Sequence, residues 1–211
     1  MKLKSLIFIL FSMAVMITSA ACNKNESTFE NSTITPNEAV PADSTIRMLY
    51  MGQASFRIVT EQGKVIYIDP YAGDSYSLSA NLILVTHEHF DHNAIERVEY
   101  RQSDCRIIRS RDAVIEGEHQ TFDLGFVRVE AVEAGFNQYH DIRQCVGYVL
   151  TFNNGKKVYI SGDTSTTDQM REMSEMHIDY AFLCTDGVYN MGNEEAAQDR
   201  KSTRLNSSHR L

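Results

Sequence analysis

A short apolar run, Leu82 to Val85, leads directly into the pattern HxHxDH, formed by His87, His89, Asp91 and His92. An uninterrupted apolar run of this length is typical of a buried strand, so these side chains are expected at a strand end. Three of the 7 His residues of the chain fall within these few positions. Imidazoles and a carboxylate at this density suit borderline divalent metals such as zinc.

Two further residues stand where additional ligands are expected. His140 precedes the apolar run that starts at Val146, and Asp163 follows the one that ends at Ser161. Both therefore lie at strand ends or in loops, where a rigid sheet can support a ligand. The alternating spacing lets His87 and His89 point to one side while Asp91 and His92 turn towards a neighbouring position, so the pattern is compatible with two ions.

The rest of the body is rich in strand signals separated by turns. The expected strands are residues 47–50, 54–60, 64–69, 82–85, 106–109, 146–152, 157–161 and 178–184, with a further hairpin over 120–134. The expected helices are residues 93–101, 167–176 and 193–200. Hairpins first, followed by alternating strands and helices, predict an α/β layered domain with a mostly antiparallel sheet.

The N-terminus has the composition of a targeting segment. Lys2 and Lys4 precede an apolar stretch from Leu6 to Ile17, which is better suited to a signal peptide than to a spanning helix. Residues 19–22 resemble a bacterial lipobox, in which the cysteine is lipid-modified and becomes the mature N-terminus. We therefore expect a lipoprotein signal peptide over residues 1–21, with lipidation at Cys22. Ordinary cleavage after Ala21 and a retained anchor are the alternatives.

Residues 22–45 are polar and nearly free of apolar side chains, so we assign them as a flexible tether and begin the folded domain at residue 46. Without Cys22, three cysteines remain in apolar runs: Cys105, Cys145 and Cys184. An odd number and the absence of a CxxC pair favour buried free thiols over a disulfide framework or a cysteine metal site. The net charge of −8 argues against nucleic acid as a partner.

On these residues the sequence resembles the metallo-β-lactamase-fold hydrolases over about residues 46–200, because HxHxDH is the signature of that superfamily. The resemblance implies an αββα sandwich with the metals at the upper edge of two sheets. It implies that one ion is bound by His87, His89 and His140. It further implies that Asp91 and His92 bind a second ion, and that Asp163 bridges the two.

Within the superfamily, several strings resemble the branch that includes L-ascorbate-6-phosphate lactonase. They are residues 51–56, 67–71, 146–149 before 162–164, and 185–191. One departure concerns the C-terminus. The family completes its second metal site with a further His, after one more helix and a strand, whereas residues 201–211 contain no apolar run and no acidic residue. We therefore expect that the C-terminal part of the domain is missing, that residues 201–211 are a non-native tail, and that His209 is not a ligand.

The expected function is that of a metal-dependent hydrolase, in which a metal-bound hydroxide attacks a lactone, ester, amide or phosphodiester bond of a small-molecule substrate. Two divalent ions are the expected cofactors, zinc first, with manganese or iron as alternatives. Asp91 is the expected catalytic residue, since it can manage the proton of the attacking water. Asp69, at a strand end, either orients the histidine-rich loop or hydrogen-bonds a turn.

Three other functions remain open at this point: a non-catalytic metal-binding envelope lipoprotein, an inactive truncated fragment, and a β-lactamase proper. The last has no specific motif in its favour. The expected location is the bacterial cell envelope, with the protein attached to the membrane through a lipid anchor or exported. The sequence gives no prediction of the oligomeric state.

Overall fold

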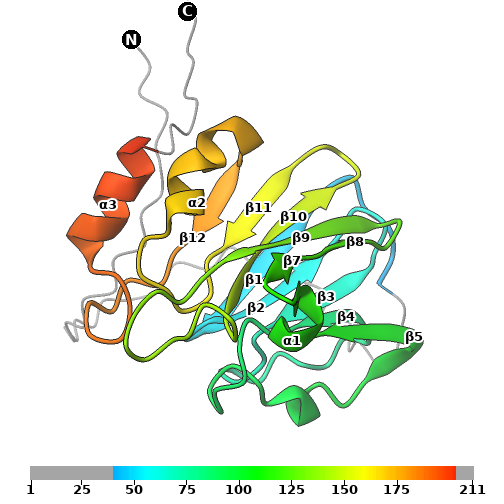
Figure 1. Cartoon of the computed structure of the whole chain (residues 1–211). Helices are drawn as coiled ribbons and strands as arrows, with labels where there is room; N and C mark the ends of the chain where they lie inside the picture. The colour runs from blue at the N-terminus through cyan, green and yellow to red at the C-terminus, as the bar shows by residue number, and fades with distance from the viewer. Residues whose placement is uncertain (1–39, 203–211) are drawn as a thin grey trace, which may run out of the picture. The chain divides into compact units, whose positions relative to one another are not determined.

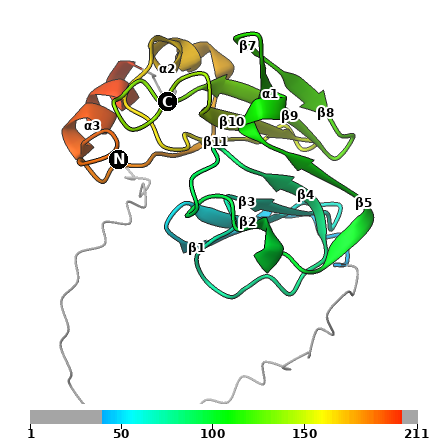
Figure 2. The same ribbon diagram turned by 60° about the horizontal axis from the view of Figure 1, so that its bottom comes forward.

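The computed structural model describes residues 40–202, with side chains described up to residue 197. The expected signal peptide, Cys22 and most of the expected tether and tail lie outside the described residues. Two five-stranded sheets form the domain and lie face to face (Figures 1 and 2).

The first sheet has the order β1-β2-β3-β4-β5. Its strands are β1 (Arg47–Gly52), β2 (Ser55–Val59), β3 (Val65–Ile68), β4 (Ala80–Leu84) and β5 (Arg101–Ile108). The pairings from β1 to β3 are antiparallel, whereas β3, β4 and β5 run parallel. The expected hairpin between β2 and β3 is confirmed.

The second sheet has the order β12-β11-β10-β9-β8. Its strands are β8 (Thr121–Asp123), β9 (Val127–Glu133), β10 (Val146–Phe152), β11 (Lys157–Ile160) and β12 (Tyr180–Phe182). The two expected hairpins, over 120–134 and 146–161, are confirmed, and only β11 and β12 run parallel. A small third sheet joins β6 (Val114–Ile115) to β7 (Glu118–His119) after α1 (Ser110–Ala113).

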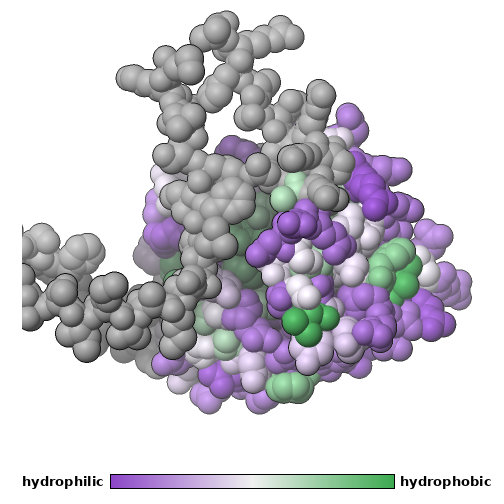
Figure 3. Space-filling model, turned by 90° about the vertical axis from the view of Figure 1, so that its left-hand side faces the viewer, coloured by the Kyte–Doolittle hydropathy of each residue, from purple (hydrophilic) through white to green (hydrophobic). Residues whose placement is uncertain are grey.

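The main core lies between the two sheets. Because strand side chains alternate between faces, every second residue of the central strands points into this layer, including Ile58, Ile66 and Leu82 from the first sheet and Tyr148 and Leu150 from the second. The face drawn in Figure 3 is mainly hydrophilic, with apolar side chains in small separate patches. Most apolar residues of the central strands are buried.

The outer faces of the two sheets are covered differently. Helix α2 (Asp168–Glu172), the 3₁₀ turn η2 (Met173–Met176) and α3 (Asn193–Ser202) cover the second sheet, and Met170 and Met173 contact Val149 and Tyr159. The hydroxyl of Thr167 caps α2 by accepting from the Met170 amide at 3.0 Å. The amphipathic helix expected over 167–176 is thus an α-helix that ends in a 3₁₀ turn.

Loops and one 3₁₀ turn, η1 (Ile95–Arg97), cover the first sheet, with Leu78 and Val98 packed against Ile83. The helix expected over residues 93–101 is therefore wrong. The Ala80 amide donates to the Tyr100 carbonyl at 3.0 Å, and Arg101 already pairs with Ala80 in the sheet. Parallel pairing with β4 thus begins at Arg101, the last residue of this segment, and the three residues before it form neither helix nor strand, against the local helical pattern.

Cys105, Cys145 and Cys184 are free thiols; Cys145 is buried, as expected, whereas the other two are half-buried. At the N-terminal side, Val40 packs against the outer face of the first sheet, and the Asp43 amide donates to the Glu61 carbonyl at 3.0 Å. The last residues of the expected tether thus lie against the domain. Among the described residues, no helix is long and apolar enough to cross a membrane.

Candidate metal centre

The strand ends that carry the candidate ligands meet at one edge of the two sheets. The segment after β4 carries the HxHxDH residues, and the segments before β10 and after β11 carry His140 and Asp163. Two hydrogen bonds join the sheets there: the Val146 amide donates to the Thr86 carbonyl at 2.9 Å, and the Tyr148 hydroxyl donates to the Val85 carbonyl at 3.0 Å. The edge is therefore held from both sheets.

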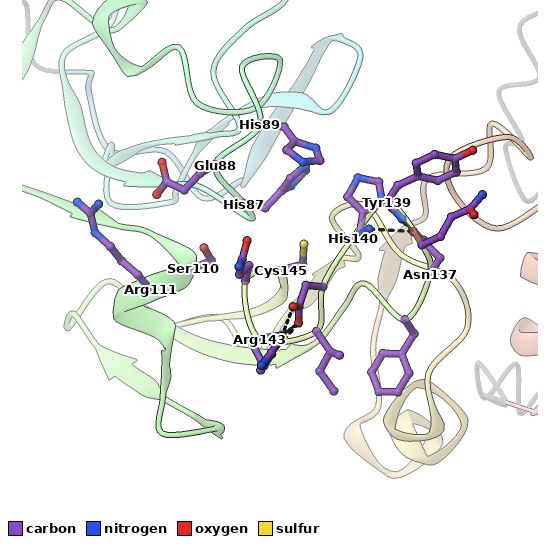
Figure 4. A pocket seen from close by; sticks show the side chains of 15 residues that line it. His87, Glu88, His89, Ser110, Arg111, Asn137, Tyr139, His140, Arg143 and Cys145 are labelled. Carbon is purple, nitrogen blue, oxygen red and sulfur yellow. Dashed lines mark hydrogen bonds and ion pairs between the residues drawn. The ribbon is translucent and has the colours of Figure 1, made fainter.

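A first group of possible ligands consists of His87, His89 and His140, whose ring nitrogens lie within 4.8 Å of one another. The ring centroids of His87 and His89 are 4.5 Å apart, and those of His89 and His140 are 5.0 Å apart. His87 and His140 are buried and His89 is exposed, so the group opens to solvent on one side (Figure 4). These are the three residues expected to bind the first ion.

A second group consists of His87, His92 and Asp163, with ligand atoms again within 4.8 Å of one another. Asp163 Oδ2 is 3.5 Å from His92 Nε2 and 3.4 Å from His140 Nε2. It therefore lies between the two groups, where a shared carboxylate is expected. Asp91 is near the second group, with its Oδ2 4.0 Å from His92 Nε2.

His87 carries the clearest sign that the centre is built for an ion. Its Nδ1 contacts the Thr86 hydroxyl at 3.1 Å, but its Nε2 is buried without a hydrogen-bond partner among the described residues. A buried polar atom left unpaired costs about 1–3 kcal/mol, so such atoms are uncommon unless an ion or water completes them. Imidazole nitrogen is a preferred zinc ligand, and the donor set fits a divalent ion of this kind.

Asp69 is fully buried and contacts residues of the loop that carries the candidate ligands. Its carboxylate accepts from the Thr86 amide at 2.7 Å and from the Thr86 hydroxyl at 2.6 Å, and lies 2.9 Å from His92 Nδ1. Asp69 therefore contacts His92 directly and His87 through Thr86. Such outer partners fix the ring orientation of metal-binding histidines.

Two side chains at the centre were not identified from the sequence. Asn137 Oδ1 accepts from the His140 amide at 3.0 Å and lies 3.2 Å from His140 Nδ1. Gln53 donates from its side-chain amide to Asp91 Oδ2 at 2.6 Å. An Asn three residues before an expected ligand is a recognisable turn signal. Gln53 offered no local signal, because it approaches from a distant turn.

Burial and nearby charges set opposite protonation preferences within the centre. Burial, assisted by the neighbouring His92, lowers the pKa of His87, and burial also lowers that of His140 against the opposing charge of Asp163. Burial alone would lower the pKa of His92, but Asp69 and Asp163 outweigh it and raise this pKa to about 10. Burial opposes ionisation of Asp163, but His92 and other neighbours hold its pKa below the ordinary value. Neutral His87 and His140 and an ionised Asp163 are the ligand forms that a metal needs.

A pocket of about 760 Å³ opens beside the first group. Figure 4 shows His87 and His89 on one side and the segment around Asn137, Tyr139 and His140 on the other, with Arg111 and Glu88 at one end. A volume of this size accommodates a small molecule. The first group therefore lies in the wall of a pocket that a substrate can enter.

Comparisons with known proteins show which family this chain resembles. A family model described as "Beta-lactamase superfamily domain" matches residues 47–206. A UPF0173 metal-dependent hydrolase of Rubrobacter xylanophilus is 30% identical over 159 residues, which cover 62% of this chain and 66% of that protein. A second such hydrolase, from Natranaerobius thermophilus, is 30% identical over 172 residues, which cover 72% of this chain and 76% of that protein.

Among solved structures, a protein of Parabacteroides distasonis described as a candidate metal-dependent hydrolase has a TM-score of 0.64 and 28% identity. The match covers 74% of this chain and 77% of that one.

Proposed function

The chain belongs to the β-lactamase superfamily, as a metal-dependent hydrolase of the metallo-β-lactamase fold and of the UPF0173 family, and from this premise we propose its chemistry. The proposed reaction is hydrolysis of a lactone, ester, amide or phosphodiester bond in a small-molecule substrate. Two divalent ions at the edge of the sheets are the proposed cofactors.

The buried, unpartnered Nε2 of His87 is the observation that carries the proposal. Because His87 belongs to both groups of possible ligands, one orphaned nitrogen faces the place where both sets of donors converge. In the proposed arrangement His87, His89 and His140 hold one ion, and His92 and Asp91 hold the second. Asp163 is the proposed bridge, on the basis of its similar distances to His92 and His140.

Ions bound there would act as Lewis acids that lower the pKa of a water molecule and polarise the substrate oxygen. Asp91 is the proposed residue for proton transfer. Its Oδ2 accepts the hydrogen bond from Gln53, so Oδ1 is the oxygen left to accept a proton. Asp69 keeps the Nδ1 side of His92 occupied, which leaves Nε2 to face the ligand side.

Zinc is the proposed metal, because four imidazoles and two carboxylates form a borderline donor set. Manganese and iron accept the same donors and are the alternatives. Metal analysis of the purified protein measures both the identity and the number of the bound ions. Two equivalents of zinc per chain are expected, and the absence of bound transition metal would count against the proposal.

The variant that tests the site is His87→Ala combined with His89→Ala, and the matched control is His177→Asn, which changes an exposed histidine. The double variant is expected to lose bound metal while the control keeps it. Unchanged metal content in the double variant would overturn the assignment.

Activity is tested with 4-nitrophenyl esters, simple lactones, bis(4-nitrophenyl) phosphate and nitrocefin. Turnover that disappears in the double variant supports a hydrolase. Stoichiometric metal without turnover of any member would instead favour the non-catalytic metal-binding lipoprotein, and turnover of nitrocefin alone would favour a β-lactamase.

The proposed location is the bacterial cell envelope, on the basis of the targeting segment and Cys22. Labelling with a palmitate analogue is expected for the full chain and not for the Cys22→Ser variant. Export without labelling would indicate ordinary signal peptide cleavage.

A further inference from the structure

We propose that Arg111 selects substrates that carry an anionic group, a carboxylate or a phosphate, separated from the hydrolysed bond. This inference rests on the proposed hydrolase function and names the class of substrate for the same pocket. It follows from the charged and the apolar side chains that line that pocket.

Apart from its histidines, four charged side chains line the pocket: Glu88, Arg111, Asp141 and Arg143. Asp141 is bound by Arg143, whose Nε and Nη2 lie 3.1 and 2.6 Å from its two oxygens. This ion pair is internally neutral. It leaves neither member as a free charge for a ligand.

Glu88 is likewise paired. Its Oε2 accepts from Arg109 at 2.7 Å and also from the side-chain amide of Asn93. Because Arg109 also donates to Asn93 at 2.6 Å, the three side chains form a closed network. The negative charge of Glu88 is therefore already neutralised by Arg109, which does not line the pocket.

Arg111 is different, because it has no hydrogen bond or ion pair with any residue in the described part of the chain. A guanidinium without a partner presents a planar fork of donors that matches a carboxylate or phosphate. Outside the candidate metal centre, it is the one charged side chain of the pocket lining that makes no ion pair within the described structure. The pocket thus offers an unpaired positive charge and no unpaired negative one.

The backbone that carries Arg111 is held in place by helix α1. It projects from α1, where the neighbouring Ser110 and Ala113 are buried, and Asp112 accepts a hydrogen bond from the Arg109 amide at 3.0 Å. In Figure 4, Arg111 lies at one end of the pocket, and His87 lies between it and Tyr139. An anion bound at Arg111 would therefore lie away from the aromatic end, with the candidate ligands between the two ends.

Apolar and aromatic side chains also line the pocket. They are Phe136, Tyr139 and Ile142, which are 43%, 45% and 39% exposed. Of these, Tyr139 lies at the end opposite to Arg111 (Figure 4). Apolar side chains left exposed beside a polar site mark a contact surface for a ligand. A substrate with an anionic group at one end and an apolar group at the other matches this distribution, whereas a cationic substrate would meet Arg111 without compensation.

The experiment compares 4-nitrophenyl esters of equal acyl length that end in a methyl, a carboxylate, a phosphate or a trimethylammonium group. In the wild-type protein, kcat/KM for the anionic esters is expected to exceed that for the methyl ester by about tenfold, as hydrogen bonds to charged groups allow. Comparison of the carboxylate and phosphate esters identifies the preferred anion.

The variants are Arg111→Gln and Arg111→Lys, with Arg171→Gln as the control, since Arg171 is an exposed arginine that pairs with Asp168. Arg111→Gln is expected to abolish the anionic preference through KM, measured as the ratio of kcat/KM for the anionic esters to that for the methyl ester in the same variant. Arg111→Lys is expected to retain part of the preference because it keeps the charge, and the control to retain all of it. An anionic preference that survives in Arg111→Gln, or is absent from the wild type, would overturn the inference.

Failure of the proposed function is recognised separately. If the wild type hydrolyses none of the esters, binding of 4-phenylbutyrate and 4-phenylbutyl phosphate is measured by calorimetry in wild type and Arg111→Gln. Any contact of these anions with bound metal is common to both proteins, so the difference reports Arg111. Affinity reduced by about tenfold in the variant supports the inference, and equal affinity contradicts it.

Discussion

The side-chain amide of Gln53 donates to Asp91 Oδ2 over 2.6 Å, although the two residues are 38 positions apart in the chain. Gln53 lies in the turn between β1 and β2 with a φ of 52°, in the left-handed region. The Tyr50 hydroxyl donates to its carbonyl at 2.9 Å and helps to hold this turn. A left-handed backbone at a residue other than glycine costs about 1–2 kcal/mol, and here it accompanies a contact with the candidate metal centre.

Replacement of Gln53 by Met is expected to weaken metal binding, because the side chain keeps its length but loses the donor that orients Asp91. Loss of an outer partner of a metal ligand typically costs about 10–100-fold in affinity. Competition with a chromophoric zinc chelator measures the metal affinity of the variant. Gln62→Met, in the exposed turn after β2, is the control and is expected to bind metal like the wild type. Equal affinities for both variants would exclude an orienting role for Gln53.

Replacement of Asp69 by Asn is expected to lower both stability and metal affinity. The amide group cannot accept from Thr86 and contact His92 as the carboxylate does, and it leaves buried donors unpaired. The cost of such a loss is about 1–3 kcal/mol. Urea unfolding of the metal-free protein measures the stability, and chelator competition the affinity. Asp74→Asn, at an exposed position, is the control. A variant that unfolds like the wild type would show that the hydrogen bonds of the Asp69 carboxylate do not contribute to stability.

The sequence-based prediction was most successful where the signal is local. His87, His89 and His92 follow a continuous apolar strand, and His140 and Asp163 adjoin two others, so strand ends alone bring them to one edge. Gln53 could not be predicted in this way, because its contact with Asp91 depends on how the β1–β2 turn lies against a distant loop. The helix expected over 93–101 failed for the same reason, since pairing with β4 overrides a local pattern.

Replacement of Tyr148 by Phe is expected to destabilise the fold by about 1–2 kcal/mol, because it removes a buried hydrogen bond and leaves the Val85 carbonyl without that donor. Tyr148 is fully buried between the sheets, and Val85 lies two residues before His87. Urea unfolding measures the change. Tyr180→Phe, at a position that is 58% exposed, is the control and is expected to remain within about 0.5 kcal/mol of the wild type.

The thiols are expected to react slowly in the folded protein. Burial, with a contribution from Asp163, raises the pKa of Cys145 and of Cys184 to about 12, so both remain protonated at pH 8. At pH 8, alkylation by iodoacetamide, followed by peptide mass mapping, is expected to label Cys145 and Cys184 only after unfolding. Within the native state, labelling should increase as the pH rises, because only the thiolate reacts. Rapid labelling of Cys145 at pH 8 would contradict its buried, protonated state.

Gly162 and Gly155 provide a matched pair for the close packing beside Asp163. Both have positive φ, 61° and 80°, so Ala at either position is strained by about 1–2 kcal/mol. A Cβ at Gly162 would lie 2.8 Å from the Val146 carbonyl oxygen and 2.9 Å from the Thr86 Cβ, whereas at Gly155 it would meet nothing within 4 Å among the described residues. The free energy of unfolding of Gly162→Ala, measured with urea, is therefore expected to fall by about 1–3 kcal/mol more than that of Gly155→Ala, because of overpacking.

Gly162→Ala is also expected to bind less metal, because Thr86 and Asp163 must shift apart. Equal losses in the two variants would show that the backbone strain alone, and not the contact with Thr86, decides the requirement for glycine.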